Sequence, residues 1–317
     1  MAGFLMLFQA CVSAPQTKLL LQQSISLPPF YEIQNVPFFP QEDYFCGPTT
    51  LAEILQFYAL DIEPETVAPN LFIPGRKGSL QIEMVSSIRQ FGLLAYAEQG
   101  DVAQLLSLIN EDIPIIVLQN QGLSWYPLWH YALVIGYDLE AEKIILHTGV
   151  NEGRIVAMDL FESTWKKGDY WMLAVLPPEK NSKHFDPFLY ISAAQDLMAV
   201  GQEQAGIKAL ASASNQWSEY WLSYFLLGNY YLQDSPGDAL NWFQKGSEAG
   251  GNIPSYLNNY AYAALYNDCA PQALELIQRA IGLDPDNPTL QDSLTDIRQV
   301  LSEQQVEQTN LNSSCSI

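Results

Sequence analysis

Alanine recurs at a fixed interval in the second half of this chain, and that interval constrains the fold more than any other sequence feature. Ala205, Ala239 and Ala273 follow one another at intervals of 34 residues. A period of this length is typical of stacked helical hairpins, in which small residues recur because the paired helices approach closely. We therefore expect three hairpins over residues 188–288 and a capping helix over residues 289–304.

The repeated segments resemble tetratricopeptide repeats. The third segment matches that pattern best, through Ala261, Ala273, Ile277, Ala280 and Pro285. The resemblance implies a concave surface that binds peptides or proteins, so we expect the repeats to dock a protein substrate or partner. A purely structural extension of the first half is the alternative.

Composition limits the classes of partner. Apolar residues make up 48% of the 317 residues and charged residues 15%, which is typical of folded domains. The 14 Lys and Arg against 35 Asp and Glu give a formal net charge of -21, so nucleic acid is not an expected partner, because phosphate binding needs clustered cations. No apolar run reaches the ~18–20 residues of a membrane-spanning helix.

The N-terminus has a different character. Residues 3–8 are apolar and are followed by Ala10-Cys11 and a polar run, without any Asp or Glu before residue 31. This segment resembles a bacterial lipoprotein signal, in which the cysteine becomes the lipidated first residue. The resemblance implies lipidation of Cys11 and a protein anchored in the bacterial cell envelope, facing the periplasm, with no other contact to the membrane. A frayed apolar terminus with an incidental cysteine is the alternative.

A second cysteine stands at the start of a predicted helix. Residues 48–60 carry apolar side chains at helical spacing, at Leu51, Ile54, Leu55 and Tyr58. Proline is favoured in the first helical turn, so Pro48 places Cys46 at the N-terminus of this helix. The positive end of the helix dipole favours a thiolate there, which is one way in which a fold activates a nucleophile.

Two further residue types complete a candidate site. Gln41 stands five residues before Cys46, where its amide can donate to a developing oxyanion together with the Cys46 N–H. The chain has three histidines, so a base for the thiol must come from His130, His147 or His184. His130 begins the alternating strand HYALVIGY, His147 ends the next strand, and His184 lies in a predicted linker.

Together these residues resemble the papain-like cysteine peptidases of the bacteriocin-processing, double-glycine leader peptidase type. The matching residues within 31–178 are Gln41, Cys46-Gly47-Pro48, His130 and Gly136-Tyr137-Asp138. The resemblance implies an α+β papain-like fold and a peptide substrate, with neither a cofactor nor a metal. Cys46 would attack the carbonyl, His130 would act as base, and Gln41 with the Cys46 N–H would stabilise the oxyanion.

The third member of the site departs from the family, which places Asp or Asn on the strand after the histidine. Alignment of strand ends puts His147 at that position, whereas a simple antiparallel register from the 138–143 turn pairs His130 with Asn151. We rank His147 first and Asn151 second, and a Cys–His dyad is the remaining possibility. The aromatic loop 121–129 before His130 is either a substrate wall or ordinary packing.

The predicted organisation is therefore a signal and linker over residues 1–30, a papain-like cysteine peptidase domain over 31–178, a linker over 179–187, helical repeats with a capping helix over 188–304, and a disordered tail over 305–317. The leading function is peptide-bond hydrolysis. Two alternatives stay open: an acyl transferase on the same residues, and a degenerate peptide-binding scaffold, which the missing acidic third residue favours.

Overall fold

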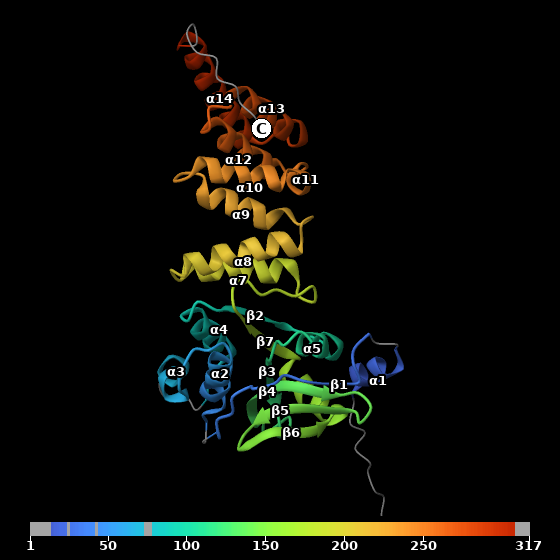
Figure 1. The fold of residues 1–317 in the computed structure, drawn as a ribbon. Coiled ribbons are helices and arrows are strands. Elements are labelled where there is room, and N and C mark those ends of the chain that lie inside the picture. The colour runs from blue at the N-terminus through green and yellow to red at the C-terminus, as the bar shows by residue number, and fades with distance from the viewer. Residues whose placement is uncertain (1–13, 24–25, 42–43, 73–77, 308–317) are drawn as a thin grey trace, which may run out of the picture. The chain divides into compact units, whose positions relative to one another are not determined.

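The computed structural model describes residues 14–23, 26–41, 44–72 and 78–307. The chain divides into two compact units (Figure 1). The first consists of Met1–Pro177 with Ser182–Leu189, and the second of Pro178–Asn181 with Tyr190–Ile317. Cys11 and the tail after residue 307 lie outside the described residues.

An antiparallel sheet organises the first unit. Its strands among the described residues are β1 (Phe30–Glu32), β2 (Leu94–Gln99), β3 (Ile115–Asn120), β4 (Trp129–Asp138), β5 (Lys143–Thr148), β6 (Asn151–Ala157) and β7 (Trp171–Leu176). They run in the order β2-β7-β3-β4-β5-β6, and β1 pairs with the end of β4 beyond β3. The long strand β4 is thus central and carries His130 at its start.

Helices cover both faces of this sheet. They are α1 (Pro15–Gln22), α2 (Cys46–Phe57), α3 (Pro64–Leu71), α4 (Gln81–Arg89), α5 (Val102–Ile109) and α6 (Met158–Trp165). Figure 1 shows α2, α3 and α4 together on one side of the sheet and α1 with α5 on the other. The α+β antiparallel architecture expected for the first half is present.

Local sequence explains the elements that position the site. Helix α2 buries nearly its whole first two turns, from Gly47 to Leu55, because the segment is apolar on all sides except for two threonines and Glu53. Strand β3 follows Pro114 as a buried run of β-branched residues, which suits a central strand covered on both faces. Asp101 caps α5 by accepting the Gln104 N–H at 2.8 Å.

The apolar and aromatic residues of segment 165–177 predict a closing strand, and the structure differs from that prediction. Helix α6 continues through Trp165, a short 3-10 turn follows at Lys166–Gly168, and β7 begins only at Trp171. Phe161 and Trp165 are spaced by one helical turn and both are buried, and the Trp165 indole donates to the Trp171 carbonyl at 2.8 Å. Burial of this aromatic pair on one helix face outweighs the strand preference of tryptophan.

The predicted linker packs within both units. Phe185 is buried against Tyr96 in the first unit, with ring centroids 4.2 Å apart. The Gln104 amide also donates to the His184 carbonyl at 2.7 Å. In the second unit the Tyr190 hydroxyl donates to the Lys180 carbonyl at 2.9 Å. This segment is therefore fixed by side-chain packing and hydrogen bonds.

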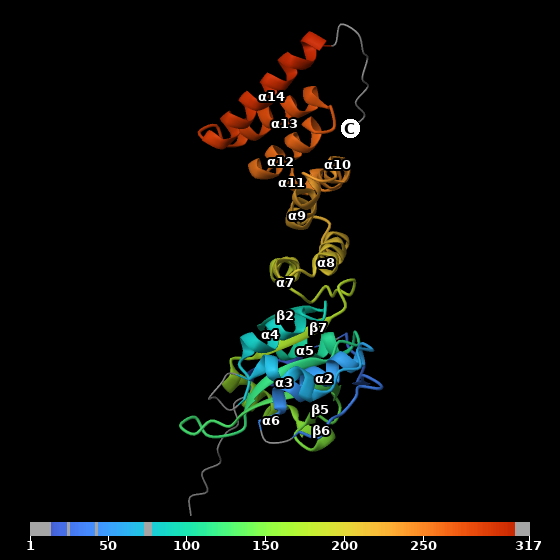
Figure 2. The same cartoon turned by 90° about the vertical axis from the view of Figure 1, so that its left-hand side faces the viewer.

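Helices make up most of the described part of the second unit, and the first of them begins at Pro187. Its helices are α7 (Pro187–Ala199), α8 (Glu203–Gln216), α9 (Trp221–Tyr231), α10 (Pro236–Lys245), α11 (Ser247–Gly250), α12 (Pro254–Leu265), α13 (Ala270–Leu283) and α14 (Pro288–Glu307) (Figure 2). Consecutive long helices form hairpins, and Ala239 and Ala273 are fully buried between them. Gly228 lies against the Phe243 ring, where a Cβ atom would come within 2.5 Å of it.

None of the helices in the described part of the chain is long and apolar enough to span a bilayer.

Candidate active site

Cys46 is the first residue of α2, and its sulfur lies among backbone donors. The N–H groups of Tyr131, Gly47 and Cys46 itself are the backbone donors that act on its charge. Burial raises the pKa of the thiol, and these three N–H groups offset that rise only in part. The helix N-terminus thus supplies the expected donors, while desolvation keeps the resting sulfur a thiol.

Gln41 is held by two hydrogen bonds to Gly149 in the turn after β5. The Gln41 N–H donates to the Gly149 carbonyl at 2.9 Å, and the Gln41 Oε1 accepts the Gly149 N–H at 3.1 Å. Its Nε2 is buried and makes no hydrogen bond to the described residues. An anchored amide whose N–H₂ group has no partner is a donor available to a ligand.

His130 lies at the start of β4, opposite Gln119 of β3. Its Nε2 is 2.7 Å from the Thr148 hydroxyl, at the end of β5. Burial and, to a smaller extent, the nearby charge of Arg154 lower the pKa of His130 to about 4. The imidazole is therefore neutral at pH 7.

His147 is engaged elsewhere. Its Nε2 is 3.2 Å from the Val36 carbonyl, and its Nδ1 accepts the Gly153 N–H at 3.0 Å. These contacts fix the proton on Nε2 and occupy both nitrogens. Asn151 is exposed and pairs with Thr148 across the turn between β5 and β6. The hydroxyl of Thr148, instead of either predicted third residue, contacts the His130 ring.

The structure brings Gln41, Cys46 and His130 to one end of β4 and β5. The Cys46 sulfur meets the amide of the residue after His130, the His130 ring meets Thr148, and the next residue, Gly149, holds Gln41. Among the described residues, no hydrogen bond joins the Cys46 thiol to the His130 ring. His184 lies apart, with its Nε2 3.6 Å from a Glu111 carboxylate oxygen.

Two features of this end of the sheet were not predicted from the sequence. Thr148 follows His147 directly, and its only sequence signal is a hydroxyl at the end of a strand that faces the start of β4. Arg154, on β6, is near enough to His130 to lower its pKa, but it lies in a mostly exposed strand without an alternating apolar pattern, so the sequence carries no signal for it.

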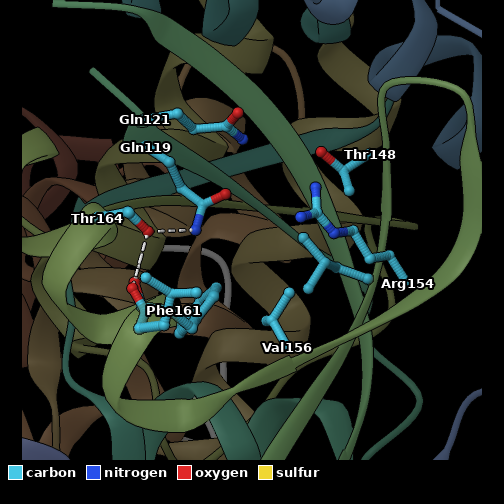
Figure 3. A pocket seen from close by; sticks show the side chains of 9 residues that line it. Gln119, Gln121, Thr148, Arg154, Val156, Phe161 and Thr164 are labelled. Atoms are coloured by element: carbon cyan, nitrogen blue, oxygen red, sulfur yellow. Dashed lines mark hydrogen bonds between the residues drawn. The ribbon is translucent and has the colours of Figure 1, made fainter.

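A pocket adjoins His130 on the side of β3, β5 and β6. It has a volume of about 180 Å³ and is lined by Gln119, Gln121, Leu146, Thr148, Arg154, Val156, Leu160, Phe161 and Thr164. Figure 3 shows Arg154, Thr148 and the two glutamines around the same space, with Phe161 and Val156 at its base. The loop leading from this pocket to His130 exposes aromatic rings, with Trp125 79% and Tyr126 64% accessible, so these rings are not packed into a core.

One protein family matches part of this sequence. Residues 33–168 match the model of the family described as Peptidase_C39 like family. That segment spans α2 and strands β2 to β6 and is less than half of the chain. No curated protein matches the sequence. The family match supports a peptidase of the cysteine hydrolase class in the first unit.

Solved structures also align with part of the chain. A C39-like peptidase from Bacillus anthracis is 16% identical, with a TM-score of 0.40, over 49% of this chain and 99% of that one. The peptidase domain of Streptococcus ComA, a bifunctional ABC transporter of a quorum-sensing pathway, is 19% identical, with a TM-score of 0.38, over 45% and 99%. A double-glycine motif protease from an AMS/PCAT transporter, in complex with its leader peptide, is 19% identical, with a TM-score of 0.37, over 46% and 94%.

Proposed function

We propose that the first unit is a cysteine peptidase that hydrolyses peptide bonds through an acyl-enzyme on Cys46. The observation that carries this proposal is the set of donors at one end of the sheet. Backbone N–H groups surround the Cys46 sulfur, and the buried Gln41 Nε2 has no partner among the described residues. Donors fixed in advance around a nucleophile are what an oxyanion requires.

In this proposal the proton of neutral His130 is on Nε2. The Thr148 hydroxyl, which can donate or accept, then accepts the Nε2–H at 2.7 Å, and the lone pair on Nδ1 is left for the thiol proton. A hydroxyl orients the ring but stabilises an imidazolium less than a carboxylate would. The Cys46 thiol and the His130 ring are not hydrogen-bonded to each other in the absence of substrate. We expect this hydrogen bond to form when substrate binds, since catalytic hydrogen bonds often tighten only in the complex.

The reaction then proceeds in two halves. Nδ1 of His130 takes the thiol proton, the sulfur forms a bond to the substrate carbonyl carbon, and the oxyanion rests on Gln41 Nε2 and the Cys46 N–H. The C–N bond breaks as the imidazolium returns the proton to the leaving amine. Water attacks the thioester, and release of the acid restores the thiol and the neutral ring.

The test is turnover of a peptide library by the full chain, read by mass spectrometry. Cys46→Ala and His130→Ala are each expected to abolish cleavage while circular dichroism stays unchanged. Wild-type protein quenched in acid should carry a thioester-linked acyl group on Cys46. Full cleavage by either variant contradicts the proposal, and transfer of the acyl group to an added amine would indicate an acyl transferase.

A second candidate, a peptide-binding scaffold without catalysis, is favoured by one observation. The thiol and the imidazole are both neutral at rest and are not hydrogen-bonded to each other. Iodoacetamide distinguishes the candidates, because an activated sulfur alkylates faster than a free thiol of similar exposure. If the protein is a scaffold, iodoacetamide should alkylate Cys46 slowly, and neither His130→Ala nor an added peptide should change that rate.

The remaining assignments are proposals of the same kind. We propose that the helical unit docks a protein substrate or partner as a tetratricopeptide-like array, and that Cys11 is lipidated in the bacterial envelope. Palmitate labelling tests Cys11, with Cys11→Ser as the control.

A further inference from the structure

The pocket beside His130 contains a cation that the fold itself does not neutralise. Arg154 projects from β6 into the pocket, and within the described residues no carboxylate forms an ion pair with it. The remaining polar groups of the lining are neutral, namely Gln119, Gln121, Thr148 and Thr164. The chain has 35 acidic residues and 14 basic ones, yet the lining of this pocket contains one basic residue and no acidic one. The pocket is therefore positively charged in a strongly acidic protein.

Three of the neutral groups near this cation are held in place by hydrogen bonds. The Gln119 Nε2 donates to the Thr164 hydroxyl at 2.8 Å, and Gln119 is almost fully buried. Thr148 is equally buried and is fixed by its contact with His130. Figure 3 shows the Arg154 guanidinium between Thr148 and the two glutamine side chains. Gln119, Thr148 and Thr164 are therefore held in place before any ligand enters, whereas Arg154 and Gln121 are exposed.

The opposite side of the pocket is apolar and small. Leu146, Val156 and Phe161 line it, and the volume of about 180 Å³ is below the roughly 300–1,000 Å³ of pockets for drug-sized ligands. The space has room for one side chain or one terminal residue of a peptide. The methylene groups of such a ligand would contact the apolar wall, and a negatively charged group would bind the guanidinium of Arg154. Arginine binds carboxylates through paired N–H donors.

We propose that this pocket binds a carboxylate of the peptide substrate, through Arg154, next to the cleavage site. The carboxylate belongs either to an acidic side chain or to the C-terminus of the peptide. This inference rests on the proposed peptidase function, because the pocket shares Thr148 with the base His130. Burial is the larger cause of the low pKa of His130 and the charge of Arg154 is the smaller one; the carboxylate would neutralise that charge, so binding favours the protonated ring that the thiolate needs.

The experiment measures binding without turnover, in the full-length Cys46→Ala protein. The probes are N-acetyl-glutamate methylamide and its glutamine analogue, and N-acetyl-alanine and its methylamide. The side-chain amide signals of Gln119 and Gln121 report binding in NMR titrations, because both residues line the pocket. We expect one acid to bind about tenfold or more tighter than its neutral partner, and that acid identifies the source of the carboxylate.

Three variants locate the effect. Arg154→Gln should remove the preference for acid, and Arg154→Lys should retain part of it, since the charge remains but the planar fork is lost. Lys143→Gln, at the far end of β5, is the matched loss of a positive charge and should bind as the parent does. Equal binding of acid and neutral probes, a preference that survives Arg154→Gln, or no binding of any probe overturns the proposal.

Turnover separates this inference from the function on which it rests. If wild-type protein cleaves no peptide but the binding pattern holds, the peptidase assignment fails and the carboxylate pocket remains. If peptides are cleaved with kcat/KM independent of acidic residues, of the C-terminal carboxylate and of Arg154, the pocket assignment fails and the peptidase remains.

Discussion

At the scale of single residues, the candidate site depends on which hydrogen-bonding groups the fold has already used. Gln41 has its oxygen occupied by Gly149, so its N–H₂ group faces no competing acceptor. Gln41→Ala should therefore lower kcat by about 10²–10³ with little change in KM, because the lost donor acts on the oxyanion and not on the bound substrate. Kinetics on the best library peptide provide the measurement.

Gln99→Ala is the matched control for Gln41, since Gln99 is exposed on the edge strand β2, away from the site. It should leave kcat unchanged. A loss of less than tenfold for Gln41→Ala would show that this amide only anchors the loop to Gly149.

His130 provides a second prediction at this scale. Burial is the larger cause of its low pKa and Arg154 the smaller, so the ring should titrate near 4 in wild-type protein. Arg154→Gln should move the midpoint upward but leave it below the ordinary 6.5, while Arg154→Lys should keep it low. NMR of the imidazole Cε1–H signal measures this, and a wild-type midpoint near 6.5 would contradict the described environment.

The sequence indicated Gln41, Cys46 and His130 through residue type and spacing, but it did not indicate Thr148. The reason lies in the register between β4 and β5 and in the point where β5 ends. Gly136 pairs with Ile145 and Val134 with Leu146, so an irregularity between them shifts the pairing by one residue. Counting back from the turn leads to Asn151 without this bulge and to residue 150 with it, but β5 ends before both, at Thr148, and the hydroxyl of this last strand residue contacts His130.

At the scale of elements, periodicity predicted α2 and β4 because each has a strong apolar pattern and a clear start signal. It did not reveal β6, which is mostly exposed and has no alternating apolar pattern, nor α6, whose aromatic residues suit a strand as well as a helix. These two elements supply Arg154 and one wall of the pocket. The part of the site that the sequence concealed is thus the part carried by elements without a periodic signal.

Helix α2 contains a titratable group that links its packing to pH. Glu53 is fully buried, and one carboxylate oxygen accepts the Phe39 N–H at 3.1 Å. Burial raises the pKa of this carboxyl to about 8. The folded state therefore holds a proton that the unfolded state releases above pH 4.5, so the contribution of Glu53 to stability is complete below that pH and is lost as pH rises toward 8.

Glu53→Gln should remove this dependence, since an amide oxygen can still accept the Phe39 N–H but the side chain does not titrate. Between pH 5 and 7.5 the free energy of unfolding of wild-type protein should fall relative to the variant by about 1.4 kcal/mol per pH unit. Urea unfolding followed by tryptophan fluorescence gives both values. Parallel pH profiles for the two proteins would mean that Glu53 is ionised in the folded state.

At the scale of the whole molecule, the two units have different residue patterns in the sequence. Alternating strands with short helices occupy the first, and helices with small residues near the 34-residue spacing occupy the second. The helical content of the second half follows from that spacing, whereas the docking of the intervening segment does not. Proline and charged residues around 178–187 are typical of a linker, and only tertiary contacts reveal that Phe185 is a core residue.

Phe185 therefore tests whether the connection between the units is structural. Its ring is 3% exposed and lies against Tyr96 of β2, and the Tyr96 hydroxyl accepts the Asp186 N–H at 2.9 Å. Phe185→Ala in the full chain should lower the free energy of unfolding of the first unit by about 3–5 kcal/mol, the usual cost of a buried aromatic ring.

Phe188→Ala is the matched control, because Phe188 is 55% exposed and its loss should cost less than about 1 kcal/mol. If both variants unfold at the wild-type urea concentration, residues 182–189 are a flexible tether in solution, and peptidase activity should tolerate insertions there.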